Sequence, residues 1–179
     1  MNGARGVTLI ELMATLAVAA ILLTVAAPDW RRMVGQHQLR AVVSDLYHDI
    51  ALTRSQAIAR GTRVMLVPAE QASWDAGWTV MVDRDGDRRP GAGDELLAVH
   101  QAVPKGIRIS SVFTGQRAPF YIAFNGTGRG CSDTSSVAAR WGSLSISGDG
   151  QVRRIRISML GRARVCDPAR EPATCGAAE

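Results

Sequence analysis

The segment 1–28 constrains this chain more than any other, because it is an apolar run with one acidic side chain near its start. Between Val7 and Ala27 the polar residues are three threonines and Glu11, and Pro28 closes the run. A helix over residues 7–27, rising about 1.5 Å per residue, matches the thickness of one bilayer hydrocarbon core. A carboxylate in lipid costs several kcal/mol unless it is paired. We therefore expect a transmembrane helix whose acid needs a partner from another molecule.

This segment resembles the N-terminus of type IV prepilins and type II secretion pseudopilins. A short basic leader, residues 1–6, ends at Gly6, and the sequence Val-Thr-Leu-Ile-Glu follows it. The resemblance implies that a prepilin peptidase cuts after Gly6 and that the new N-terminus, Val7, is methylated. It also implies that Glu11 pairs with the N-terminal amine of a neighbouring subunit and that Pro28 kinks the helix. The family usually has phenylalanine where this chain has Val7.

The resemblance also implies a location. Residues 7–27 would anchor the chain in the bacterial inner membrane, with the C-terminal domain in the periplasm, and would later form the core of a pilus or pseudopilus. Two simpler interpretations stay open, a secretory signal peptide and an ordinary membrane anchor. A signal peptide has a shorter apolar core, and here the apolar run continues beyond the Ala-Val-Ala-Ala at 17–20 that imitates a cleavage site.

A second pattern follows over residues 28–61. Apolar residues recur three and four positions apart, which is typical of an amphipathic helix, and Gly61 is a typical helix end. We expect this continuation of the helix to pack on a domain through one stripe, formed by Leu39, Val42, Val43, Leu46, Ile50 and Ile58.

Beyond Gly61 the pattern changes to short β-type runs separated by Gly, Pro, Asp and Asn. One long helix followed by antiparallel strands predicts an α+β fold. The resemblance implies the type IV pilin-like plan, in which an antiparallel β-sheet domain packs on the long N-terminal helix. We expect a β-rich domain over 62–166, with a tight hairpin at 148–150, and a flexible tail over 167–179. The expected strands are 62–67, 78–82, 96–101, 107–113, 120–124, 143–147 and 151–158.

The three cysteines all lie in the C-terminal third of the chain. If the helix anchors the chain, this part faces an oxidising compartment. We expect a disulfide between Cys131 and Cys166, which would pin the tail to the domain, in preference to the shorter link between Cys166 and Cys175. The sequence has no Cys-x-x-Cys pair, so no metal site is predicted at the cysteines.

Residues 77–97 resemble the GspH/FimT group of minor pilins and pseudopilins, through Gly-Trp-x-Val-x-x-Asp, Arg-Asp-Gly-Asp and Asp-Glu-Leu-Leu. The resemblance implies a Gly-rich aspartate loop between two strands. Asp83, Asp85 and Asp87 are also spaced like the first ligands of a calcium loop, but Arg88 stands where an EF-hand needs glycine. A polar hairpin loop is the favoured interpretation, and calcium binding stays open.

The chain is basic, with a formal net charge of +5, and of its 21 Lys and Arg residues only Lys105 is a lysine. Arginine favours planar, bidentate partners such as phosphate. Gly161, Arg162 and Arg164 form a segment that resembles the Gly-Arg-x-Arg motif of FimT-type minor pilins. Those proteins bind DNA during natural transformation, and the resemblance implies that this segment binds DNA.

The preceding strand is expected to extend this basic surface. Because side chains alternate along a strand, Arg154 and Arg156 should face solvent while Ile155 and Ile157 face the core. Such an arginine surplus predicts binding to phosphates without sequence preference. Trp141 is a secondary candidate for contact with DNA, although packing in the core or on the sheet is its favoured interpretation. A solvated strand face or a subunit contact would also explain it. The alternative function is therefore a tip-assembly subunit of a secretion system or pilus that does not bind DNA.

The sequence predicts no enzyme and no cofactor. His37, His48 and His100 have no neighbouring nucleophile and acid that would suggest a catalytic triad. The glycine-rich run 126–130 lacks the Gly-Lys-Ser/Thr ending of a phosphate-binding loop. The expected partners are other pilin or pseudopilin subunits, the prepilin peptidase, the inner membrane and DNA.

Overall fold

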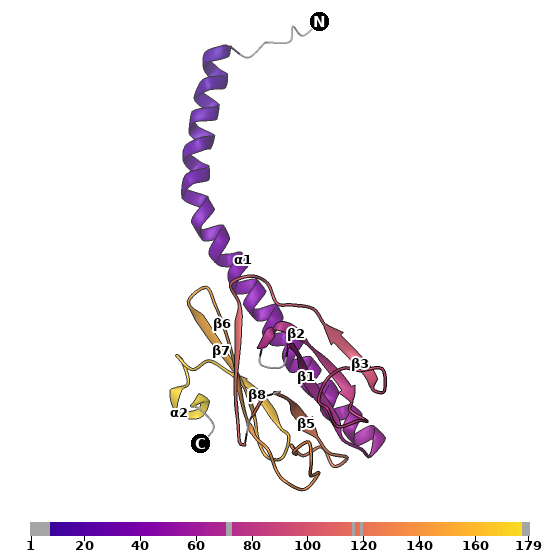
Figure 1. Cartoon of the computed structure of the whole chain (residues 1–179). Helices are drawn as coiled ribbons and strands as arrows, with labels where there is room; N and C mark the ends of the chain where they lie inside the picture. Colours follow the sequence, from indigo (N-terminus) through magenta and orange to yellow (C-terminus); the bar gives the residue numbers. More distant parts are fainter. Residues whose placement is uncertain (1–7, 71–72, 116, 119, 177–179) are drawn as a thin grey trace, which may run out of the picture.

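The computed structural model describes residues 8–70, 73–115, 117–118 and 120–176, without the side chains of residues 23–29 and 31. One long helix, α1 (Leu9–Arg60), extends from a β-domain that contains two four-stranded antiparallel sheets (Figure 1). The predicted α+β architecture, a long helix packed on antiparallel strands, is confirmed, with two sheets in place of the single sheet that the sequence suggests.

Helix α1 begins and ends at capped positions. Thr8 is the N-cap, and its Oγ1 accepts a hydrogen bond from the backbone N–H of Glu11 at 3.3 Å. Gly61 ends the helix in the left-handed conformation, with φ 62°, and its N–H donates to the carbonyl oxygen of Ile58 at 3.2 Å. The predicted helix end at Gly61 is confirmed.

The C-terminal half of α1 forms one wall of the hydrophobic core. Ile58 is 49% exposed and lies outside the buried stripe, so its predicted core position is wrong. Thr53 and Ala57, both 0% exposed, continue the stripe instead, because 3.6 residues per turn place them under Ile50. The other stripe residues are buried as predicted: Leu39, Val42, Val43, Leu46 and Ile50.

The first sheet has the strand order β3-β2-β1-β5, and it is buried on both faces except at the edge strand β3, which is partly exposed. Alternating residues such as Leu66 and Val80 pack in the core with α1, whereas Met65 and Met81 belong to a second buried cluster on the opposite face. The strands are β1 (Val64–Glu70), β2 (Ser73–Val82), β3 (Glu95–His100) and β5 (Ile122–Phe124).

The second sheet has the order β4-β6-β7-β8 and is buried on one face. Leu144, Ile146 and Ile155 close the core from this side. Asp149 (φ 49°) and Gly150 (φ 72°) form a two-residue hairpin loop between β6 and β7, as predicted. The strands are β4 (Arg108–Phe113), β6 (Gly142–Gly148), β7 (Gln151–Ile157) and β8 (Ala163–Cys166).

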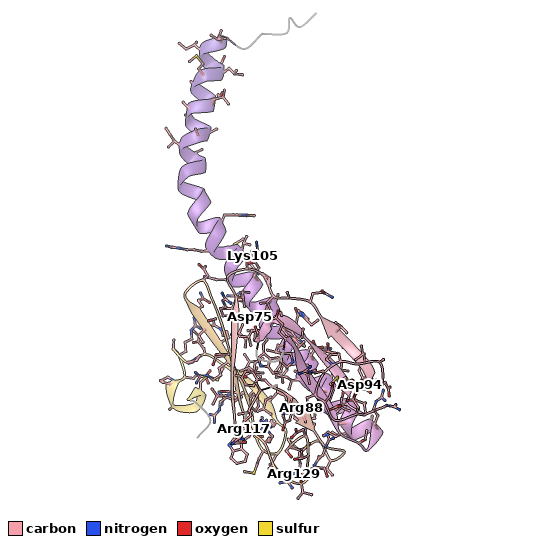
Figure 2. The ribbon with its side chains drawn as sticks, viewed as in Figure 1. Asp75, Arg88, Asp94, Lys105, Arg117 and Arg129 are labelled. Atoms are coloured by element: carbon pink, nitrogen blue, oxygen red, sulfur yellow. A yellow bond between two sulfur atoms is a disulfide. The ribbon has the colours of Figure 1, made fainter. Side chains whose placement is uncertain are left out.

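Asp75 on β2 connects the two sheets (Figure 2). Its Oδ1 accepts a hydrogen bond from the backbone N–H of Ile109 at 2.6 Å, and its Oδ2 pairs with Arg108 at 3.1 Å. All buried core residues among those described lie between Leu39 and Cys175. A fragment over residues 34–179 therefore retains the whole core.

All seven predicted strands are present, with shifted bounds. The sequence pattern did not predict β8 or the short helix α2 (Pro172–Cys175). Each has only four residues, too few for an alternating or helical pattern to emerge.

The predicted disulfide is wrong. Cys166 pairs with Cys175, with Cα atoms 5.8 Å apart, and Cys131 is free and buried. Cys131 packs in the second cluster, on the outer face of the first sheet, whereas Cys166 lies on the last strand of the second sheet. Cys131 and Cys166 therefore lie against different sheets, and Cys175 of the tail is the cysteine that reaches Cys166.

We expect peptide mapping of the unreduced protein to recover Cys166 linked to Cys175, because tryptic cleavage after Arg170 separates them only when the link is reduced. Iodoacetamide should label Cys131 in denatured protein and leave it unlabelled in folded protein near neutral pH, since burial raises the pKa of this thiol to about 11. Recovery of Cys131 in a disulfide would contradict the structure.

Candidate functional site

The predicted N-terminal processing site lies outside the described residues, because Gly6 and Val7 precede Thr8. Glu11 lies in the first turn of α1 and is exposed. Pro28 lies within α1, and its side chain is outside the described residues, so the predicted kink stays a prediction. The hydrogen bond to Thr8 uses the backbone of Glu11, which leaves the carboxylate available for another partner.

The first half of α1 exposes a continuous apolar surface. Leu9 is 80% exposed and Leu22 is 64% exposed, and the residues between them are exposed as well. Across the part of the chain that the structure describes, no helix meets the length and apolarity needed to cross a membrane. Val7 and the side chains of residues 23–27 lie outside that part, and the span 7–27 stays a prediction.

The arginines predicted to bind DNA do share one face. In the ladder of β7 and β8, Arg156 lies directly opposite Arg164, and Arg154 lies opposite Cys166. Ile155 and Ile157 are buried on the other face, as predicted. The backbone N–H of Ser158 donates to the carbonyl oxygen of Arg162 at 3.0 Å, which extends the same ladder by one position. We call this surface of β6, β7 and β8 the arginine face.

The C-terminal tail packs on the arginine face, which corrects two predictions. Arg154 donates to Ser145 Oγ at 3.0 Å and to the carbonyl oxygen of Cys175 at 2.6 Å, and Arg156 donates to that of Thr174 at 2.5 Å. These two side chains are therefore half-buried under the tail and not fully exposed as predicted. The tail over 167–176, predicted to be flexible, is packed beside β7 and β8, where a disulfide and α2 hold it (Figure 1). Residues 177–179 lie outside the described residues.

The two arginines of the motif are more open. Arg162 is exposed, and no side-chain partner for it is found among the described residues. The Arg164 side chain is 54% exposed and pairs with Glu171 of the tail. On the other side of β7, Arg153 pairs with Asp167 at 3.0 Å.

Gly161 has a structural reason to be glycine. Its φ is 77°, and a Cβ there would lie 2.0 Å from the carbonyl oxygen of Gly128. The same carbonyl oxygen accepts a hydrogen bond from Arg54 Nε of α1 at 2.8 Å. Gly161 thus allows the turn before β8 to contact the 125–130 loop and α1, and this contact positions Arg162 and Arg164.

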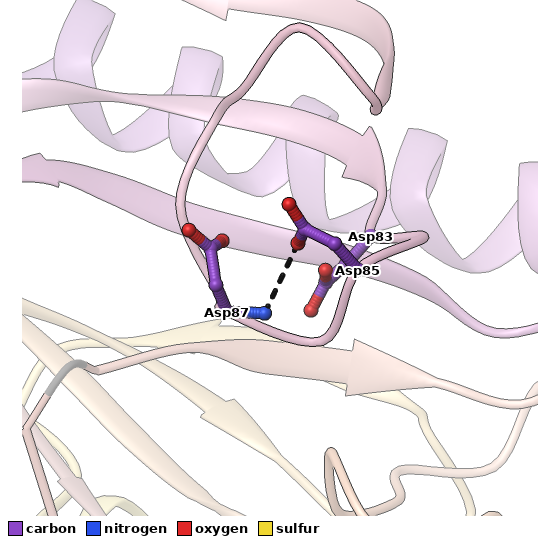
Figure 3. Close-up of side chains that lie close together, drawn as sticks. All are labelled: Asp83, Asp85 and Asp87. Atoms are coloured by element: carbon purple, nitrogen blue, oxygen red, sulfur yellow. Dashed lines mark hydrogen bonds between the residues drawn. The ribbon is translucent and has the colours of Figure 1, made fainter.

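The carboxylates of the aspartate loop between β2 and β3 accept hydrogen bonds from the backbone of the loop itself. The oxygens of Asp83, Asp85 and Asp87 lie within 4.8 Å of one another (Figure 3). Each carboxylate also accepts a hydrogen bond from a backbone N–H of the loop, including Gly86 to Asp83 at 2.8 Å and Arg89 to Asp87 at 2.7 Å. Burial raises the pKa of Asp83. This geometry agrees with the favoured polar hairpin loop.

A cluster that the sequence did not predict connects this loop to the far side of the first sheet. The guanidinium carbons of Arg88 and Arg140 lie 5.5 and 4.2 Å from the ring centroid of Tyr121. The Tyr121 hydroxyl donates to Asp133 at 2.8 Å. Burial of Asp133 opposes its ionisation, but the hydrogen bond from Tyr121 and the charge of Arg88 outweigh it and lower the pKa of Asp133. No short sequence motif contains these residues, because three separate loops supply them.

The contacts of His100 are those of a structural residue. The ring of His100 stacks on that of Trp78, with centroids 4.1 Å apart, and its Nε2 faces Asp45 at 3.4 Å. His37 and His48 are exposed on α1.

The glycine-rich loop that contains Gly128 is stabilised from within. The side chain of Asn125 accepts hydrogen bonds from backbone N–H groups of this loop.

A long N-terminal helix whose second half packs on antiparallel sheets, with an exposed apolar first half, defines a pilin-like subunit. Residues 1–27 match the prokaryotic N-terminal methylation motif, and residues 42–161 match the family described as type II transport protein GspH. The chain belongs to this GspH family. Membership implies processing by a prepilin peptidase, anchoring in the inner membrane, and assembly with other pseudopilin subunits. The family consists of structural subunits and not of enzymes.

Two solved structures illustrate the fold. The type IV minor pilin FimU of Pseudomonas aeruginosa is 15% identical, with a TM-score of 0.54 over 73% of this chain and 94% of that chain. The minor pseudopilin EpsH of the type 2 secretion system of Vibrio cholerae is also 15% identical, with a TM-score of 0.52 over 73% of this chain and 98% of that chain. No curated protein sequence matches the chain at a significant level.

We expect Gly161→Ala to destabilise the fragment 34–179 by more than about 3 kcal/mol, because the backbone at Gly128 must move. Gly150→Ala is the matched control: its φ of 72° is similar, but the space around it is open, so it should cost only about 1–2 kcal/mol. Urea denaturation of both variants measures the difference. Equal losses would show that the contact with Gly128 does not constrain the turn.

Proposed function

We propose that this chain is a minor type IV pilin that binds extracellular DNA without sequence preference, for uptake in natural transformation. The supporting observation is the register of the second sheet, which gathers Arg154, Arg156, Arg162 and Arg164 on one face. Guanidinium groups bind phosphate oxygens in a planar, bidentate manner. Among the described residues, the only helix on this face is α2, which has four residues and is held against the sheet, so it cannot enter a groove to read base edges. This supports binding through the phosphates alone.

The contacts of the tail divide these arginines into two pairs. Arg162 and Arg164 are exposed, so they are the proposed phosphate contacts. Arg154 and Arg156 already donate to tail carbonyl oxygens, so their proposed role is to hold the tail and to add positive potential. Gly161 is proposed to act indirectly, by fixing the turn that presents Arg162.

The alternative function is a tip-assembly subunit, of a type II secretion system or a pilus, that does not bind DNA. The observation that favours it is the same tail, which occupies donors of three of the four arginines. In either function we propose cleavage after Gly6, N-methylation of Val7, a helix kink at Pro28, and pairing of Glu11 with the terminal amine of a neighbouring subunit.

DNA binding is tested with the fragment 34–179 and a labelled duplex in fluorescence anisotropy. We expect a Kd of roughly 10⁻⁴ to 10⁻⁶ M that weakens steeply as salt rises. The double variant Arg162→Gln/Arg164→Gln should weaken binding for every sequence and reduce the slope of log K against log salt by about 2.

The control is Arg40→Gln/Arg84→Gln, which removes the same charge from exposed positions away from the arginine face. This variant should lose much less affinity. Equal losses of affinity in the two double variants would show that net charge, and not the arginine face, determines DNA binding. An absence of binding in the wild-type fragment would leave the assembly function.

Assembly is tested with Glu11→Gln in the full chain. This change keeps the backbone hydrogen bond to Thr8, so the helix start is preserved while the charge is lost. We expect little or no variant subunit in sheared fibres, although the membrane fraction should contain wild-type amounts, because an ion pair within a low-dielectric fibre core requires the carboxylate. Wild-type incorporation would exclude a role for this charge.

A further inference from the structure

A groove of about 520 Å³ opens on the arginine face, at the end of the sheet where the turn before β8 lies. Its lining combines an aromatic ring, three guanidinium groups and part of the tail. The residues that matter for the argument are Trp141, Arg156, Met159, Arg162, Arg164 and Thr174.

The strand register explains why Trp141 faces these arginines. Gly142 pairs with Ile157, and Ser143 pairs with Arg156, whose side chain lies on the arginine face. Side chains alternate along a strand, so Trp141, two residues before Ser143, projects from the same face. Trp141 is half-buried and lines the groove, whereas Trp74 and Trp78 are 1% and 0% exposed in the core.

The groove also retains hydrogen-bond donors. A guanidinium group has five N–H donors, so one bond from Arg156 to Thr174 and one ion pair from Arg164 to Glu171 leave further donors on both. An aromatic face beside free guanidinium donors is typical of sites that bind single-stranded nucleic acid, where a base stacks on the ring and the arginines contact phosphates. In a duplex the base faces are stacked on one another and cannot reach such a ring.

We propose that this groove holds an unpaired nucleotide, with its base on Trp141 and its flanking phosphates on Arg162 and Arg164, so that the protein prefers single-stranded nucleic acid to duplex. This inference rests on the proposed DNA binding. Glu171 competes with a phosphate for Arg164, because its carboxylate occupies part of the guanidinium group and places a negative charge beside it.

The first test uses the intrinsic fluorescence of the fragment 34–179, which contains three of the four tryptophans and lacks Trp30. Because Trp74 and Trp78 are buried, a base that stacks on the protein can quench only Trp141. We expect oligothymidylate to quench the emission with the same Kd as in anisotropy, and a duplex of equal length to bind more weakly without quenching. This measurement needs no variant and so does not depend on the folding of one.

Two substitutions sharpen the test. Trp141→Ala should weaken oligothymidylate binding by roughly 5- to 100-fold while duplex binding changes little, and Trp141→Phe should retain most of the affinity. Glu171→Gln should strengthen binding more than Glu70→Gln, which removes the same charge from an exposed position on β1.

The outcomes separate the two proposals. Equal affinity for single strands and duplex, without quenching, would overturn the groove inference and leave the proposed DNA binding in place. An absence of binding to either probe would overturn both. Quenching by single strands that Trp141→Ala abolishes would establish the site.

Discussion

Both sheets pack against one buried stripe of α1, and every other feature of the domain depends on this shared contact. Leu46 and Ile50 are fully buried between Leu66 of the first sheet and Leu144 of the second. Burying one such side chain contributes about 1.5–3 kcal/mol, and neither sheet could bury its inner face without the helix. The same contact decides which faces remain outside. The first sheet covers its outer face with the cluster around Met65, so the outer face of the second sheet is the one left to polar residues.

On that face the tail and any ligand compete for the same arginines. The strength of each contact between an arginine and the tail determines which arginines a ligand can bind. An exposed ion pair such as Arg164 with Glu171 is worth about 0–1 kcal/mol, so a phosphate can replace the carboxylate at little cost. Arg154 differs, because it is half-buried with two acceptors, and the loss of either would leave a polar group unsatisfied. In the proposed function, the tail therefore leaves Arg162 and Arg164 available to a phosphate and holds Arg154 in a structural contact.

The sequence predicted those features that repeat along the chain. The helix stripe, the end at Gly61 and the hairpin at Asp149 and Gly150 each follow from local spacing and backbone preference. The disulfide, strand β8 and the packing of the tail over Arg154 could not be predicted in the same way. They depend on which strand lies at the edge of which sheet, and this order is set by long-range packing. Alternation correctly placed Arg154 and Arg156 opposite Ile155, yet it could not reveal that the tail folds back over them.

The rigid helix separates the two proposed activities of the chain. The turn at Gly161 contacts Gly128, which in turn contacts Arg54 near the C-terminal end of α1, so the groove lies at the end of the domain far from Glu11. From Glu11 to Arg54 the helix axis spans about 65 Å at 1.5 Å per residue. Electrostatic interactions are screened within about 8 Å in physiological salt, so a charge change at either end cannot reach the other directly. The proposed pairing of Glu11 in a fibre core and the proposed binding of phosphates at Arg162 are therefore independent in energy, and α1 connects them only as a spacer between the two sites.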